Sequence, residues 1–261
     1  MLIKDQLQRK IILKNPLNRI ISLVPSQTEM LVDLGLHKEI VGITKFCIHP
    51  KNLRKNKTLV GGTKQVNYQK ISDLKPDFIL CNKEENTLEM VTELQTIAPT
   101  YVSDIYTLND FYDFTNDLRR IFAPNPNFLN FTNTLQEKVS NFRKQMQKLP
   151  TKNKKVAYLI WANPYMAVGS PNFIDEMIKI NGFTNLFSDR KRYPVIQLKD
   201  LQQADYVFLS SEPFPFNEKQ AKEIKNYTNA KIIFVDGEMF TWYGTRLLKA
   251  FDYFLDLHKS L

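Results

Sequence analysis

The stretch RIISLVPSQTEML, residues 19–31, joins the end of a strand to the start of a helix. Its apolar run stops at Pro25, and a helical pattern follows from Ser26 to Leu34. Ser26 and Glu29 have capping-box spacing, in which the Ser26 hydroxyl accepts from the Glu29 N–H and the Glu29 carboxylate accepts from the Ser26 N–H. In a parallel sheet such a helix start lies at the carboxyl edge, where open α/β folds bind their ligands. The pattern fits a stable helix start without a ligand as well.

Strand and helix patterns alternate along most of the chain, as in parallel β-α-β units. The predicted strands cover residues 19–24, 40–43, 77–81, 100–102, 155–161, 206–210 and 232–235. The predicted helices cover residues 26–34, 68–74, 84–95, 108–122, 173–180, 217–227 and 244–259. Gly182 follows one of these helices, in the position of the left-handed residue that closes a helix.

A long amphipathic helix is predicted between the two halves, from Phe128 to Leu149, with Pro150 ending it. Its apolar stripe recurs at steps of four, three, four and three residues and consists of Leu135, Val139, Phe142, Met146 and Leu149. We therefore predict an α/β protein with two Rossmann-like lobes, each built on a mainly parallel sheet. The N-terminal lobe is expected at 1–123, the bridging helix at 124–151 and the C-terminal lobe at 152–261.

The composition is that of a globular protein, with 43% hydrophobic and 24% charged residues among 261. No apolar run approaches the roughly 18 residues of a membrane-spanning helix. The net charge of +9 comes from scattered lysines and arginines, which argues against a nucleic-acid partner. The N-terminus has no apolar run long enough for an export signal. We expect a cytoplasmic protein if Met1 is the natural start, and a periplasmic or membrane-associated one if a signal was removed.

The sequence contains none of the common catalytic motifs, and its three histidines have no partner at metal-ligand spacing. We therefore expect no enzyme, no resident cofactor and no metal site. If the fold serves an enzyme or a regulatory protein instead, Glu212 or Glu238 is the best candidate acid. His258 is expected to face solvent and Cys81 to be buried. Cys47 is expected in a loop that can expose it, with no disulfide required.

Aromatic residues gather in proline- and glycine-rich turns at the ends of predicted elements. They are Phe46, Trp161, Tyr193, Phe214, Phe216, Phe240, Trp242 and Tyr243. Each one alone fits a core position as well as a cleft. As a set on corresponding edges, they favour a cleft that takes a large flat ligand.

In several stretches the sequence resembles the helical-backbone class of periplasmic substrate-binding proteins, most closely its cobalamin-binding branch. The stretches are RIISLVPSQTEML with LGLHKEIVGIT, VGGTKQVNYQKISDLKPDFILC, VGSPNFIDEMIKINGFTNLF and GTRLLKAF. The resemblance implies two lobes joined by one rigid helix, with a bulky ligand held chemically unchanged in the cleft between them. It implies a corrinoid such as cobalamin as the ligand and an ABC transporter as the partner. Haem and ferric siderophores are the alternative ligands.

The resemblance also assigns ligand-facing positions. In the N-terminal lobe they are Pro25, Ser26, Phe46, Thr63 and Lys64, and Thr63 stands where a ligand-gripping tryptophan can occur. In the C-terminal lobe they are Trp161, Tyr193, Phe240, Trp242, Tyr243 and Arg246. Arg246 fits a structural ion pair equally well. Only Arg246 and Arg192 are placed to bind an anionic siderophore, which favours a corrinoid.

Docking onto a transporter permease is where the sequence departs from the family pattern. The family docks through one acidic residue on each lobe, but the matching positions here are Gln69 and Lys199. A lysine that faces the transporter's arginines repels them, and Asp200 replaces the missing acid only in part. Two expectations stay open: a transporter-linked binding protein, or a cytoplasmic derivative of one. In either case we expect a monomer.

Overall fold

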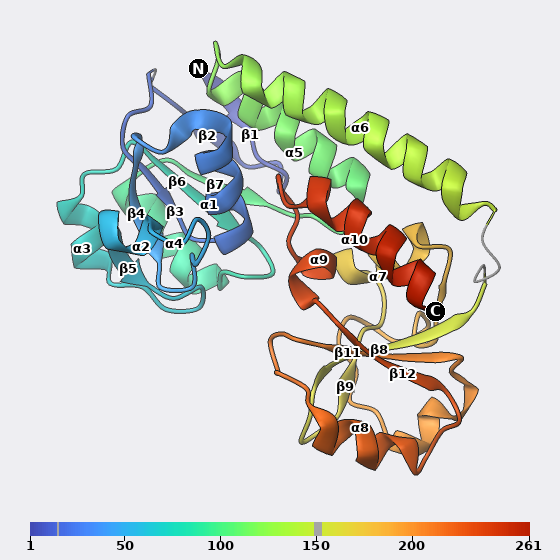
Figure 1. Ribbon diagram of the computed structural model, residues 1–261. Coiled ribbons are helices and arrows are strands. Elements are labelled where there is room, and N and C mark those ends of the chain that lie inside the picture. Colours follow the sequence, from blue (N-terminus) through green and yellow to red (C-terminus); the bar gives the residue numbers. More distant parts are fainter. Residues whose placement is uncertain (15, 149–152) are drawn as a thin grey trace. The chain divides into compact units, whose positions relative to one another are not determined.

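The computed structural model describes residues 1–14, 16–148 and 153–261 and divides the chain into two compact units (Figure 1). The first unit consists of Met1–Ile105, Asn109–Thr134 and Tyr243–Arg246. The second unit consists of Tyr106–Leu108, Leu135–Trp242 and Leu247–Leu261. Each unit contains a mainly parallel sheet with helices, so the predicted α/β class is confirmed. Among the residues that the structure describes, no helix is both long and apolar enough to cross a bilayer.

The main sheet of the first unit has five parallel strands in the order β5-β4-β3-β6-β7. The strands are β3 (Ile20–Ser22), β4 (Ile40–Thr44), β5 (Thr58–Gly61), β6 (Phe78–Asn82) and β7 (Thr100–Ser103). The helices of this half of the chain are α1 (Pro25–Leu31), η1 (Val32–Leu36), α2 (Leu53–Asn56), α3 (Tyr68–Asp73), α4 (Leu88–Ile97) and α5 (Leu108–Ile121). Strands β3, β6 and β7 are buried along their whole length, as expected for parallel strands covered on both faces.

The predicted capping box at the start of α1 is wrong. The helix begins at Pro25 with Val24 as its N-cap, and no side chain caps it. Pro25 accounts for this difference, because its fixed φ and missing N–H suit the first position inside a helix. Ser26 and Glu29 consequently lie within the helix, where both are buried, and the Glu29 carboxylate pairs with Arg246 instead.

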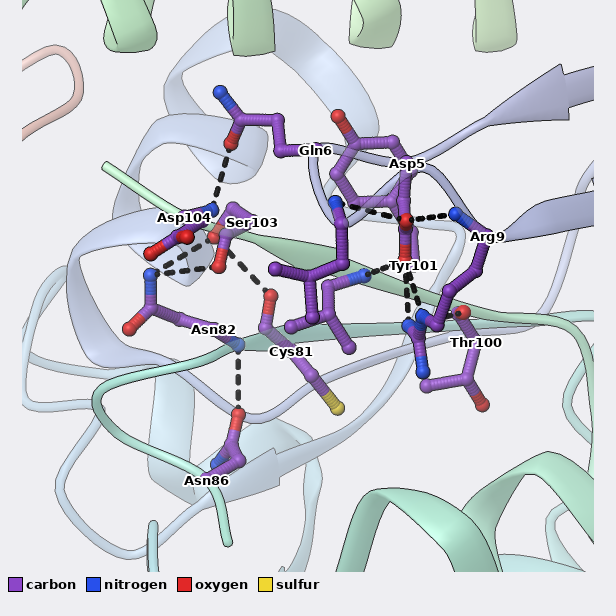
Figure 2. Close-up of polar contacts among 12 residues, drawn as sticks. Asp5, Gln6, Arg9, Cys81, Asn82, Asn86, Thr100, Tyr101, Ser103 and Asp104 are labelled. Atoms are coloured by element: carbon purple, nitrogen blue, oxygen red, sulfur yellow. Dashed lines mark hydrogen bonds and ion pairs between the residues drawn. The ribbon is translucent and has the colours of Figure 1, made fainter. Parts of the chain in front are cut away.

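An N-terminal hairpin that the sequence did not predict protects one edge of this sheet. It consists of β1 (Leu2–Lys4) and β2 (Lys10–Ile12), which pair antiparallel. Its turn reaches the edge strand β7, as Figure 2 shows: Asp5 Oδ2 accepts from the Val102 N–H at 3.3 Å, and Gln6 Oε1 accepts from the Asp104 N–H at 2.8 Å. These side chains satisfy backbone donors that an edge strand otherwise leaves open.

The sheet of the second unit has the order β10-β8-β11-β12, with β9 paired antiparallel to β8. The strands are β8 (Lys155–Trp161), β9 (Met166–Ala167), β10 (Thr184–Asn185), β11 (Tyr206–Ser210) and β12 (Lys231–Val235). The helices are α7 (Phe173–Ile180), η2 (Leu198–Gln203), α8 (Glu218–Lys225), α9 (Gly237–Thr241) and α10 (Leu247–Ser260). The bounds of β8, β11 and α7 are those predicted. Gly182 has a φ of 77°, which confirms its expected left-handed conformation.

The predicted long helix is present as α6 (Pro126–Met146), a helix of 21 residues. Its apolar stripe is buried from Phe128 through Phe142 to Met146. The predicted last residue, Leu149, and the terminating Pro150 lie outside the described residues. The boundary between the two units falls within this helix, after Thr134.

Cys47 and His258 differ from expectation because both are buried. The Cys47 thiol lies 3.3 Å from the hydroxyls of Thr44 and Thr28, and its burial raises the pKa of the thiol. In the last turn of α10, His258 Nε2 lies 3.1 Å from Asn181 Oδ1, and the imidazole stacks on Phe183. Burial lowers the pKa of His258 to about 4. Cys81 is buried as predicted, and both cysteines are free thiols.

Candidate ligand-binding site

The carboxyl ends of β3 to β7 define one edge of the first-unit sheet, since all five strands run parallel. Residues just beyond these ends therefore gather at the same edge, which we call the first ligand edge. Pro25 and Ser26 follow β3, Phe46 follows β4, and Thr63 with Lys64 follows β5. Pro25 is half-buried and Ser26 is buried, so both contribute mainly backbone to this edge.

Phe46 is the exposed aromatic side chain of the first ligand edge, with 49% of its surface accessible. A Cβ added at Gly62 would lie 3.2 Å from Phe46 Cε2, so the glycine lets the ring pack closely against the backbone after β5. The Lys45 ammonium lies 5.1 Å from the ring centroid of Phe46. The ring is thus supported by the protein while about half of its surface remains free for a ligand.

Thr63 and Lys64 are tied to the loop that follows β6. Asn86 Nδ2 donates to the Thr63 carbonyl at 2.8 Å, and the Lys64 ammonium donates to the Glu84 carbonyl. In the same loop, burial raises the pKa of Glu85. These contacts join the loop after β5 to the loop after β6, and the Lys64 ammonium is hydrogen-bonded to a backbone carbonyl.

Trp161 is an exposed aromatic side chain of the second unit, 40% accessible at the carboxyl end of β8. Its ring packs edge-on against Phe214, with 5.6 Å between the ring centroids, and Phe214 packs against Phe216 at 4.9 Å. Phe214 and Phe216 follow the parallel strand β11, so the three rings lie at the same edge of the sheet. We call this the second ligand edge.

Tyr193 lies in a segment that pairs with the chain around β9. The Ala167 N–H donates to the Pro194 carbonyl at 3.0 Å, and the Gly169 N–H donates to the Arg192 carbonyl at 2.7 Å. Since Met166 pairs with both Trp161 and Val195, this backbone ladder brings Tyr193 to the neighbourhood of Trp161. The Tyr193 side chain is half-buried.

Phe240 and Trp242 are held in the interior of the second unit. The Phe240 ring is fully buried, with its centroid 5.1 Å from that of Tyr158 and 4.8 Å from that of Phe254. Trp242 Nε1 donates to Glu212 Oε1 at 3.0 Å. Both rings are buried and therefore offer little surface to a ligand.

Glu212, the candidate acid of an alternative enzyme, is engaged with α9. Its Oε1 accepts from the Thr241 hydroxyl at 2.6 Å in addition to Trp242, and burial raises its pKa. The Glu238 N–H donates to the Asp236 side chain in the cap of α9. The Glu212 carboxylate and the Glu238 N–H therefore both make contacts that stabilise α9 and the residue after it.

Tyr243 and Arg246, predicted with the C-terminal lobe, belong to the first unit. Arg246 donates to both carboxylate oxygens of Glu29, from Nε at 2.9 Å and from Nη2 at 2.6 Å, and both side chains are buried. Tyr243 is buried and accepts from Gln27 Nε2 at 3.3 Å. Of the two roles open for Arg246, the structure shows the ion pair.

The predicted docking residues lie on exposed elements, and two of them have local partners. Gln69 Nε2 donates to Asp73 Oδ1 at 2.8 Å, one turn further along α3. Lys199 is exposed at the start of η2. The neighbouring Asp200 carboxylate accepts from Arg190 at 3.1 Å and from the Gln197 N–H at 3.3 Å.

Sequence reasoning missed two supporting features of these edges. Gly62 provides the close approach for Phe46, and its signal is the GGT that follows the short apolar run TLV. The ladder that carries Tyr193 depends on Gly169, where a Cβ would lie 2.1 Å from the Arg190 carbonyl oxygen. Neither glycine has a sequence pattern that identifies its neighbour across the fold.

Two α/β units with ligand edges at the carboxyl ends of their strands are typical of a binding protein. The chain belongs to the periplasmic binding protein family, whose pattern matches residues 20–227. The proteins of this family bind substrates for uptake systems and are not enzymes, which is the class that the sequence predicted.

The relatives include a vitamin B12-binding protein of Vibrio vulnificus (strain YJ016). It is 26% identical over 200 residues, which cover 75% of this chain and 72% of the relative. An uncharacterized ABC transporter substrate-binding lipoprotein of Bacillus subtilis, YvrC, is 23% identical over 269 residues, which cover 95% of this chain and 82% of that protein.

Solved structures of binding proteins with different ligands share the fold. The periplasmic vitamin B12-binding protein BtuF of Vibrio cholerae has a TM-score of 0.77 at 20% identity, with 94% of this chain and 99% of that chain covered. A periplasmic heme-binding protein from Pseudomonas aeruginosa has 0.78 at 17% identity, covering 94% and 92%. The petrobactin-binding protein YclQ from Bacillus subtilis has 0.79 at 19% identity, covering 99% and 97%. These similarities establish the fold and leave the ligand of this chain to experiment.

Proposed function

We propose that this chain binds a large metal chelate, with a corrinoid such as cobalamin as the first candidate. The observation that carries the proposal is an exposed aromatic ring at each ligand edge: Phe46, packed against the backbone at Gly62, and Trp161, packed against the Phe214 ring. A ring held at a strand end and left about half in water gains contact area when a flat ligand covers it. The vitamin B12-binding relatives support the same ligand class.

The charges at the two edges favour a corrinoid over an anionic siderophore. A ligand rich in carboxylates or hydroxamates requires several cations that are not already committed. Arg246 is paired with Glu29, Arg190 with Asp200, the Lys64 ammonium donates to a carbonyl, and the Lys45 ammonium lies over the Phe46 ring. A ligand held mainly by flat apolar contact suits this arrangement better.

The experiment is a retention assay with three chelates. Purified protein is mixed in separate samples with cyanocobalamin, haemin and a ferric siderophore, free ligand is removed on a desalting column, and the visible spectrum of the protein fraction is recorded. We expect stoichiometric retention of the corrin bands and weaker retention of the other two. If the protein fraction shows haem or siderophore absorbance without corrin bands, the ligand is that other chelate, and the chain is still a chelate-binding protein. A protein fraction that retains none of the three chelates would contradict the proposal.

We infer that ligand binding serves an ABC-type uptake system, since the family and the Bacillus relative belong to such systems. Gln69 and Lys199 in place of acids, with the Asp200 carboxylate engaged by Arg190, support weak docking onto arginines of a permease. The family is periplasmic by description, and fractionation of the producing cells tests whether this chain is exported.

A further inference from the structure

The hairpin β1–β2 has a buried face and a face open to solvent. Ile3 and Ile11 point inward and are almost fully buried. The outward positions are Leu2 and Lys4 on β1 with Lys10 and Ile12 on β2. Leu2 is 61% and Ile12 is 74% exposed, so this face combines two large apolar side chains with two lysines. We call it the outer face of the hairpin.

The pairing register places two lysines opposite each other and leaves apolar surface exposed. Leu2 lies opposite Ile12, and Lys4 lies opposite Lys10. Like charges directly opposite each other destabilise an antiparallel pair, and the Leu2 and Ile12 side chains leave most of their apolar surface in water. The repulsion between Lys4 and Lys10 and the apolar area that Leu2 and Ile12 leave in water would both be relieved by a partner surface that is apolar and negatively charged.

The hairpin is also held in one orientation. Asp5 Oδ1 accepts from the N–H groups of Leu7 and Arg9 at 3.0 and 2.9 Å, and Asp5 Oδ2 accepts from Arg9 Nη2 at 2.5 Å (Figure 2). Gln6 Nε2 donates to the Asp110 carbonyl at 2.7 Å, while the Met1 ammonium donates to the Leu13 carbonyl at 2.7 Å. The turn and both strand ends are held by these hydrogen bonds. The hairpin backbone therefore loses little conformational freedom when the outer face binds a partner.

We propose that the outer face of the hairpin docks onto an anionic lipid surface. Leu2 and Ile12 enter the boundary between head groups and acyl chains, and Lys4 and Lys10 meet the lipid phosphates. The exposed Lys14, just after β2, adds to the attraction. A second copy of the chain is a poorer occupant, because two such faces would bring lysines against lysines.

The test is cosedimentation of the full chain with phosphatidylcholine vesicles that contain or lack phosphatidylglycerol. We expect binding only to the anionic vesicles, weakened by high salt. The Lys4→Gln/Lys10→Gln variant is expected to lower the partition coefficient about 25-fold, since each lysine near an anionic surface contributes about fivefold. Leu2→Thr/Ile12→Thr keeps strand-forming residues and is expected to weaken binding at high salt as well as at low salt.

The matched control is Lys219→Gln/Lys222→Gln on α8, which changes the net charge equally at another exposed site. We expect it to alter binding by less than about twofold. Thermal unfolding confirms that each variant is folded. The proposal is overturned if the wild-type chain ignores anionic vesicles, or if the control loses as much binding as Lys4→Gln/Lys10→Gln. It is also overturned if sedimentation velocity shows a dimer that the hairpin substitutions dissociate.

Discussion

At the scale of single residues, Arg246 and Glu29 form a bidentate ion pair with both side chains buried in the first unit. Removing one member leaves the other as a buried charge without its counterion, which typically costs 3–5 kcal/mol. We therefore expect Arg246→Met to lower the free energy of unfolding by about 4 kcal/mol. The double variant Glu29→Met/Arg246→Met is expected to recover at least half of that loss. Urea denaturation of the two variants measures both values.

The exposed pair Lys138–Asp252 provides the control. Asp252→Asn is expected to change the free energy of unfolding by less than about 1 kcal/mol, because exposed ion pairs contribute little. A single Arg246→Met variant as stable as Asp252→Asn would show that the buried pair does not stabilise the first unit.

Sequence patterns predicted most of the strands whose carboxyl ends form these edges but did not determine which side chains are exposed there. Phe46 and Phe240 follow predicted strands and Trp161 ends one, yet Phe46 and Trp161 are about half exposed and Phe240 is fully buried. The difference arises because α9 carries Phe240 inward against Tyr158 and Phe254. Ser26 was misplaced because a proline at the first helical position changes the register of the cap. Such outcomes depend on contacts distant in sequence.

At the scale of elements, the last turn of α10 is fixed by His258, which contacts Asn181 and Phe183 beyond the end of α7. The pKa of His258 is about 4 in the folded chain, against about 6.5 when exposed. Between these values the unfolded chain binds a proton that the folded chain does not. We therefore expect stability to be full above about pH 6.5 and to fall as the pH decreases toward 4, by up to about 1.4 kcal/mol per pH unit.

The measurement is urea denaturation at neutral pH and near pH 5 for the wild type and His258→Gln. The variant retains an amide donor for Asn181 and loses the titrating group, so its stability should decrease less on acidification. His37→Gln, at an exposed position, serves as the control and should behave as the wild type. Equal pH dependence in all three proteins would show that His258 is not the group responsible.

Elements were predicted well where the pattern is long and uninterrupted. Strands β8 and β11 are continuous apolar runs, and α7 has an asparagine cap and a closing glycine, so their bounds agree with the prediction. The hairpin strands β1 and β2 have three residues each, and β5 has four. Segments this short carry too few positions for a period to be recognised, and their pairing is set by partners elsewhere in the chain.

At the scale of the whole molecule, the family pattern spans residues 20–227 and therefore includes residues of both units. Each unit contains a mainly parallel sheet with an exposed aromatic ring at its carboxyl edge, Phe46 in the first unit and Trp161 in the second. The relatives show that this fold serves B12-, heme- and petrobactin-binding proteins alike. Side chains, rather than the fold, consequently determine which ligand a protein of this fold binds.

The most direct test of the central claim is the affinity for cyanocobalamin of four proteins, measured by isothermal titration calorimetry. They are the wild type, Phe46→Ala, Trp161→Ala and the control Tyr227→Ala, which removes a comparably exposed ring, 47% accessible, after α8. We predict that Phe46→Ala and Trp161→Ala each weaken binding by about 1–3 kcal/mol, or roughly 5- to 150-fold, and that Tyr227→Ala leaves it unchanged. Affinity that is the same in all four proteins would contradict the proposal that Phe46 and Trp161 contact the ligand.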